Sequence, residues 1–86
     1  MIIEVCGTGC AKCHAVEDNV RKALREMGLK EGEDVMVTKV EDPLKFASRG
    51  VIFTPALLID GVKVAEGRVL DKNEIKKLIE AKMPQK

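Results

Sequence analysis

Gly7-Thr8-Gly9-Cys10-Ala11-Lys12-Cys13-His14 is the stretch around which the rest of the chain is organised. Cys10 and Cys13 are three residues apart, so on a helix their side chains lie on one face, one turn apart. A thiol at a helix N-terminus is close to unpaired backbone N–H groups and to the positive end of the helix dipole, and both favour the thiolate. We therefore expect Cys10 to be the more exposed thiol with the lower pKa, and Cys13 to be shielded. Two such thiols can close a disulfide or bind a metal together.

The composition predicts one globular domain that spans residues 1–86 and has an aliphatic core. Hydrophobic residues make up 45% of the chain, and its aromatic residues are two Phe. The net charge of +1 argues against a nucleic-acid partner, because a polyanion normally requires a clear basic excess. No apolar stretch approaches the ~20 residues of a membrane span and no signal peptide is visible, so we expect a cytoplasmic protein with no membrane attachment. Closely set cysteines in a reducing compartment are typical of a catalytic or metal-binding site.

Hydrophobic periodicity and turn residues divide the chain into seven segments. Asp42-Pro43 is typical of a helix start, and Asp60-Gly61 is a strong hairpin signal. Asp71 and Glu74 stand at the N-cap and N3 positions of the last helix, a variant of the capping box. The predicted segments are a strand at 1–6, a helix at 10–27, a strand at 35–40, a helix at 43–49, strands at 56–59 and 62–65, and a helix between Asp71 and Pro84.

The segment order β-α-β-α-β-β-α predicts an α/β fold. A right-handed crossover makes the first two strands parallel, and the last two strands form an antiparallel hairpin. We therefore expect a mixed four-stranded sheet with helices on both faces. Metal-chaperone domains with a C-x-x-C motif run β-α-β-β-α-β and end on a strand, whereas this chain ends on a capped helix.

Cys10-x-x-Cys13 at the junction of the first strand and the first helix, with Thr54-Pro55 before a hairpin, resembles the thioredoxin superfamily. The stretch from Thr8 to Cys13 is similar to that of the small, glutaredoxin-sized redox-active disulfide proteins of archaea and bacteria. The resemblance covers nearly the whole chain and implies a minimal thioredoxin fold. It also implies a cis Thr54-Pro55 bond that faces the dithiol and contributes to substrate binding. The Trp-Cys-Gly-Pro-Cys motif of ordinary thioredoxins is absent.

Four residues near the dithiol have both a functional and a structural interpretation. Lys12 adds positive charge beside Cys10, which would favour the thiolate, or is only a solvated helix residue. Glu4 stands six residues before Cys10, where the resemblance implies a buried acid that helps to deprotonate the second cysteine; it could equally be a surface residue. His14 is expected to be exposed and incidental. Cys6 is expected to be a buried thiol at the end of the strand and dispensable for turnover.

These residues predict a thiol–disulfide oxidoreductase that acts on protein disulfides. Cys10 attacks a substrate disulfide and forms a mixed disulfide, which Cys13 then resolves. We expect a monomer that needs no dissociable cofactor and no metal, and that receives electrons from a separate thioredoxin-reductase-like enzyme. The alternative is a binding module in which Cys10 and Cys13, with Cys6 or His14, hold zinc, copper or another soft metal.

Overall fold

Helices and strands follow one another in the order that the sequence predicts, β-α-β-α-β-β-α. The computed structural model describes residues 1–9 and 11–82, so Cys10 lies outside the described residues. No helix within these two ranges is both long enough and apolar enough to cross a bilayer. The elements are β1 Ile2–Cys6, α1 Ala11–Glu26, β2 Met36–Val40, α2 Pro43–Ser48, β3 Ala56–Ile59, β4 Val62–Glu66 and α3 Lys72–Lys82.

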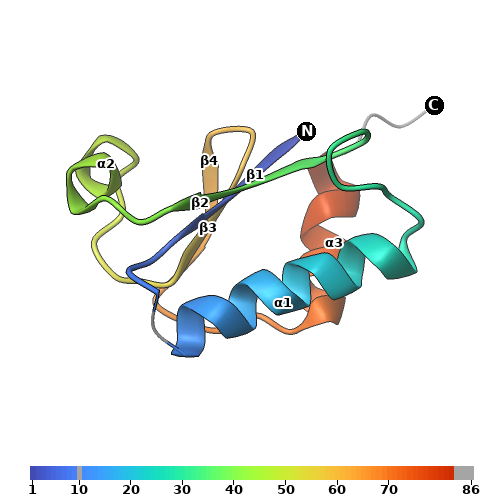
Figure 1. Ribbon diagram of the computed structural model, residues 1–86, viewed down its shortest axis with the longest axis horizontal. Coiled ribbons are helices and arrows are strands. Elements are labelled where there is room, and N and C mark those ends of the chain that lie inside the picture. The colour runs from blue at the N-terminus through green and yellow to red at the C-terminus, as the bar shows by residue number, and fades with distance from the viewer. Residues whose placement is uncertain (10, 83–86) are drawn as a thin grey trace.

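The four strands form one mixed sheet in the order β2-β1-β3-β4 (Figure 1). β1 pairs in parallel with β2, where Cys6 lies opposite Val40, and antiparallel with β3, where Cys6 lies opposite Ala56. β3 and β4 form the expected hairpin, and Asp60 and Gly61 at its turn have φ values of 50° and 83°. Positive φ at both central residues is what a type I′ turn requires. Because β1 is a central strand, the glycine-containing turn that follows it leaves from the middle of the sheet.

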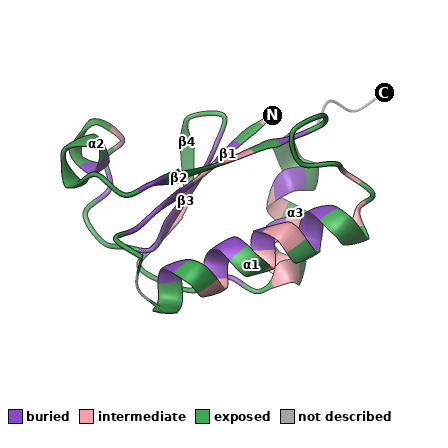
Figure 2. Cartoon of the chain, viewed as in Figure 1, coloured by how far each residue is buried: buried purple, intermediate pink, exposed green. Residues whose placement is uncertain are grey.

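Side chains of β1 alternate between two apolar clusters, one on each face of the sheet. Ile3 and Val5 belong to the larger cluster, which α1 and α3 cover, while Cys6 belongs to a smaller cluster with Phe46 of α2. Figure 2 shows the buried stripe of α1 and its exposed opposite side. The predicted mixed four-stranded sheet with helices on both faces is therefore confirmed. Neighbouring residues of β1 consequently face different surroundings, and this alternation decides which of them can reach the candidate site.

Both predicted N-caps are present. The Asp42 carboxylate accepts a hydrogen bond from the Leu44 N–H at 2.9 Å, and the Asp71 carboxylate accepts one from the Glu74 N–H at 2.8 Å. The Glu74 carboxylate, which a complete capping box would direct back to the N-cap N–H, instead accepts a hydrogen bond from Arg68 at 2.7 Å. Half of the capping box is thus formed, because an arginine in the preceding loop offers Glu74 a charged partner.

Candidate functional site

The path from β1 to α1 is short and depends on glycine. The Gly7 N–H donates to the Val40 carbonyl at 2.9 Å, which continues the pairing of β1 and β2 beyond the strand. Gly9 has a φ of 87°, in the left-handed region that glycine adopts most readily. α1 begins at Ala11. Cys10, the predicted nucleophile, stands between Gly9 and Ala11 in the sequence and lies outside the described residues.

Cys13 lies on the buried side of α1, with 6% of its surface exposed. It shares that side with Val16 and Val20, three and seven residues further along, which is the spacing of one helix face. Its neighbours Lys12 and His14 are exposed. The prediction that Cys13 is shielded is therefore confirmed, as is the predicted exposure of His14.

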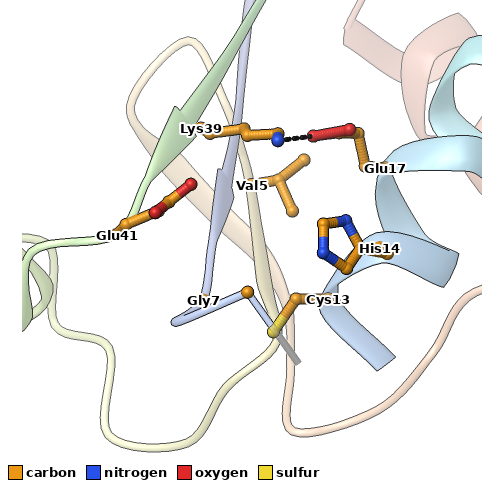
Figure 3. A pocket seen from close by; sticks show the side chains of 8 residues that line it. Val5, Gly7, Cys13, His14, Glu17, Lys39 and Glu41 are labelled. Atoms are coloured by element: carbon orange, nitrogen blue, oxygen red, sulfur yellow. Dashed lines mark ion pairs between the residues drawn. The ribbon is translucent and has the colours of Figure 1, made fainter. Parts of the chain in front are cut away.

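The Cys13 thiol packs directly against the backbone of Gly7. A Cβ atom added to Gly7 would lie 2.2 Å from Cys13 Sγ and 2.9 Å from Cys13 Cβ, closer than Cβ atoms approach other atoms in real structures. Figure 3 shows the side chain of Cys13 directed toward Gly7. Gly7 is not among the residues with positive φ, so it is the close approach of the thiol that excludes any side chain here.

A small pocket borders the Cys13 thiol between the start of α1 and the sheet (Figure 3). Its volume is about 20 Å³. A cavity needs roughly 10–15 Å³ to hold a water molecule, so this pocket has room for one. The residues that line it are Val5, Gly7, Gly9, Cys13, His14, Glu17, Lys39 and Glu41.

Glu17 supplies a carboxylate to this pocket, although its side chain is only 11% exposed. One carboxylate oxygen lies 3.3 Å from Lys39 Nζ and the other 2.8 Å from an Arg21 guanidinium nitrogen. Burial raises the pKa of Glu17, but hydrogen bonds from Lys39 and Arg21 together outweigh burial and hold the pKa below its ordinary value. Glu17 is therefore an ionised carboxylate at neutral pH, next to the pocket of Cys13.

Our sequence interpretation missed Glu17. Its position near Cys13 could have been identified from the sequence, because Glu17 follows Cys13 by four residues and so lies on the same face of the helix. A charged residue inside an otherwise apolar helix stripe requires a partner. One partner, Arg21, follows Glu17 by one helix turn, but the other, Lys39 of β2, is distant in sequence and becomes apparent only when the parallel pairing of β1 and β2 is known.

Glu4 is not one of the residues that line the Cys13 pocket. It alternates with Val5 along β1, so its side chain points to the face that carries Cys6, where Arg49 binds it. Two nitrogens of the Arg49 guanidinium donate to one Glu4 oxygen, at 2.8 and 3.0 Å, and only 15% of the Glu4 side chain is exposed. This ion pair joins the middle of β1 to the C-terminal end of α2. A tuning role for Glu4 at the dithiol stays a prediction.

Cys6 is fully buried, as expected for a thiol at the end of a strand. It belongs to the apolar cluster that includes Val40 and Phe46. Burial raises the pKa of the Cys6 thiol, the charge of Glu4 raises it further, and Arg49 opposes the two. Cys6 is accordingly a protonated thiol at neutral pH. Its cluster lies on the opposite face of the sheet from Val5, which lines the Cys13 pocket.

The Thr54–Pro55 peptide bond is cis, as the resemblance implied. Pro55 is buried, and its carbonyl accepts a hydrogen bond from the Gly67 N–H at 2.8 Å. Thr54 is exposed, and its backbone N–H and carbonyl make no hydrogen bond to another residue of the described part of the chain. The predicted contact of this loop with Cys10 lies outside the described residues.

Metal ligation was the alternative chemistry for these thiols. Within residues 1–9 and 11–82, no group of three or more His, Cys, Asp and Glu side chains is placed to hold a metal ion. Cys6 and Cys13, two of the four proposed ligands, belong to different faces of the sheet. The structure therefore does not bring Cys6 to Cys13.

The mixed sheet, the cis-proline loop and a buried helical thiol behind a glycine turn define a thioredoxin-like thiol protein. The family model described as Thioredoxin domain matches residues 1–80. A thioredoxin of Methanothermobacter thermautotrophicus is 37% identical over 79 residues, which cover 92% of this chain and 97% of that protein. A thioredoxin of Methanocaldococcus jannaschii is 38% identical over 76 residues, covering 88% of this chain and 83% of that protein. The chain belongs to the thioredoxin family of disulfide oxidoreductases.

Proposed function

We propose that this protein reduces protein disulfides by exchange through Cys10 and Cys13. The Cys10 thiolate attacks one sulfur of the substrate disulfide, forms a mixed disulfide and releases the other substrate sulfur as a thiolate, which takes up a proton. Cys13 then loses its proton and attacks the Cys10 sulfur. This step forms the Cys10–Cys13 disulfide and releases the second substrate thiol. Two electrons pass from the protein to the substrate, and no dissociable cofactor is required.

The burial of Cys13 against Gly7 is the observation that carries this proposal. A resolving thiol has to be close to the nucleophile but protected from other disulfides, and Cys13 is 6% exposed on the inner face of α1. Lys12, exposed beside the pair, adds positive charge that favours the Cys10 thiolate. Thr54 and Pro55 are the proposed substrate-binding residues, since the Thr54 backbone, which has no hydrogen-bond partner within residues 1–9 and 11–82, can form strand-like hydrogen bonds with an extended segment.

Glu17 is the proposed acceptor for the proton that Cys13 loses. Glu17 and Cys13 line the same pocket, and the pocket has room for one water molecule that could carry the proton. Lys39, at 3.3 Å from the carboxylate, keeps Glu17 ionised and ready to accept a proton. Resolution needs this transfer because only the thiolate of Cys13 attacks a disulfide.

Glu17→Gln is expected to slow the resolving step by roughly 10²-fold, the lower end of what a positioned base contributes. The mixed disulfide of the protein with a small thiol would be prepared first and then diluted into excess buffer. The release of the small thiol would be followed at several pH values. Glu31→Gln is the matched control, because Glu31 also binds Arg21, at 2.9 Å, but does not line the pocket. Equal slowing in both variants, or normal resolution in Glu17→Gln, would show that Glu17 is not the acceptor.

Electrons would come from a separate thioredoxin-reductase-like enzyme, because oxidised Cys10–Cys13 has to be reduced between turnovers.

Reduction of insulin disulfides with dithiothreitol as the electron source, together with metal analysis of the same sample, tests the proposal. We expect turnover without bound metal, and near-normal turnover in Cys6→Ala, because Cys6 is buried in the other apolar cluster. A stoichiometric metal that is lost in Cys6→Ala, with little reductase activity in the parent protein, would instead support the metal-binding module.

A further inference from the structure

The side chain of His14 lines the Cys13 pocket, although the sequence indicated no role for this residue. His14 follows Cys13 directly on α1 and precedes Glu17 by three residues, so Glu17 lies about one helix turn from both. Figure 3 shows the imidazole ring extending from α1 toward Val5 of β1, in the space between Cys13 and Glu17. His14 is at the same time exposed. Its ring is therefore in contact with both the pocket and bulk water.

Glu17 needs a group that takes its proton onward. Its side chain is only 11% exposed, and a proton that it accepts has to leave before the next turnover. Burial raises the pKa of Glu17, but hydrogen bonds from Lys39 and Arg21 outweigh burial and hold the pKa below its ordinary value. An ordinary thiol has a pKa of about 8.5, so transfer of its proton to such a carboxylate is unfavourable. A stronger base that removes the proton from Glu17 would make the transfer productive, and imidazole is such a base near neutral pH.

The other charged groups around the ring are poorer acceptors than imidazole. Lys39 of β2 is a cation that only donates. Glu41, which follows β2, is an exposed carboxylate and thus a weaker base than imidazole, and Figure 3 shows it on the far side of Val5 from His14. β1 contributes no charged group to the pocket, and Asp18, one helix turn after His14, lies outside it. Within the part of the chain that the structure describes, His14 is therefore the pocket residue best suited to exchange protons with solvent near neutral pH.

We propose that His14 is the relay through which the proton of Cys13 leaves the pocket during resolution. The Cys13 S–H bond breaks, and the proton passes through the pocket water to Glu17, then to a ring nitrogen of His14 and from there to bulk water. The electron pair left on Cys13 forms the bond to the Cys10 sulfur. The substrate sulfur leaves with the electrons of the broken disulfide bond and takes up a proton from solvent. The inference rests on the proposed disulfide reduction and assigns a further residue to its resolving step.

His14→Gln is expected to slow release of the small thiol from the mixed disulfide by roughly 10-fold near neutral pH, less than Glu17→Gln because Glu17 still accepts the proton. The difference from the parent protein should vanish toward about pH 10, where hydroxide deprotonates thiols directly. It should also shrink toward about pH 5, where imidazole is already protonated. Cys10 is bonded to the small thiol in this species and does not titrate. A loss of the same size at every pH would indicate a structural role and overturn the inference.

Two further measurements test whether the imidazole acts through Glu17. Free imidazole in the buffer should restore most of the lost rate in His14→Gln, because position 14 is exposed, and should leave the parent protein and Glu17→Gln unchanged. A variant that carries both substitutions should be no slower than Glu17→Gln alone, since the relay receives no proton without Glu17. Failure of imidazole to restore the rate, or losses that multiply in the double variant, would contradict the relay.

Lys22→Gln is the matched control, because Lys22 is also exposed on α1 but does not line the pocket. Its release of the small thiol should equal that of the parent protein at every pH. Normal release in His14→Gln together with slow release in Glu17→Gln would refute the relay alone. Normal release in both variants would refute the acceptor role of Glu17 as well. Failure of the parent protein to reduce insulin would instead refute the proposed function, a result distinct from loss of the relay.

Discussion

The Cys13→Ser variant is expected to stop at a mixed disulfide, whereas Cys10→Ser is expected to form no adduct and to show no reductase activity. The attacking thiol needs a second thiol within bonding distance to release the substrate, and serine cannot supply one. Mass spectrometry after incubation with a model disulfide protein would detect the adduct on Cys13→Ser.

The third cysteine provides the matched control for this experiment. Cys6→Ser places the same substitution in the apolar cluster on the other face of the sheet, where it should leave turnover intact. The Cys6→Ser substitution should instead lower the free energy of unfolding, because a buried hydroxyl replaces a buried thiol among apolar neighbours. Turnover that persists in Cys10→Ser would contradict the mechanism, and an adduct that forms equally on Cys10→Ser would reverse the roles of the two thiols.

The sequence predicts the fold of this protein closely because local signals and global arrangement agree. The Asp60-Gly61 turn permits only a tight hairpin, and Asp42 and Asp71 cap helices where capping residues were expected. The helix of 16 residues between the first two strands predicts a crossover connection, and the two strands are parallel as that connection requires. The turn and the helix caps are effects of near neighbours along the chain, which is why they can be identified without coordinates.

The candidate site could be predicted only in part, because its chemistry depends on pairs that are distant in sequence. The offset of Glu4 from Cys10 allowed either a role at the dithiol or a place on the surface, and it did not reveal Arg49, 45 residues away, which binds Glu4 on the face of the sheet that carries Cys6. The Glu17 carboxylate forms an ion pair with Lys39, and the Glu66 carboxylate accepts a hydrogen bond from the Ile52 N–H in a distant loop. Side-chain pairing of this kind depends on strand register and on the path of loops, neither of which a residue pattern specifies.

Gly7 is another residue whose role depends on a contact that the sequence pattern does not specify, although its partner is close along the chain. In the sequence it marks the end of a strand, and its neighbour Gly9 explains the turn by its positive φ. The requirement for glycine at position 7 comes instead from the thiol of Cys13, six residues further along, which occupies the space of a Cβ atom. A contact between the turn and the first turn of α1 is not visible in either element alone.

Gly7→Ala is accordingly expected to damage both the stability and the thiol chemistry of the protein. The new methyl group would lie 2.2 Å from Cys13 Sγ, so either the helix start or the thiol has to move. Overpacking of this kind costs about 1–3 kcal/mol. A displaced Cys13 would also attack the mixed disulfide poorly. Urea unfolding would measure the free energy of unfolding, and release of thiol from the preformed mixed disulfide would measure resolution.

The Gly28→Ala variant distinguishes the effect of the clash between position 7 and Cys13 from the effect of general destabilisation. Gly28, just after α1, has a φ of 73° and no atom near its would-be Cβ, so alanine there strains the backbone by roughly 1–2 kcal/mol but should leave resolution unchanged. The cause can be isolated further in a Cys13→Ala background, which removes the sulfur and leaves the milder 2.9 Å approach to Cβ. The stability loss from Gly7→Ala should then shrink, with a coupling of about 0.5–3 kcal/mol between the two positions. Additive losses would mean that Gly7 and Cys13 do not constrain each other.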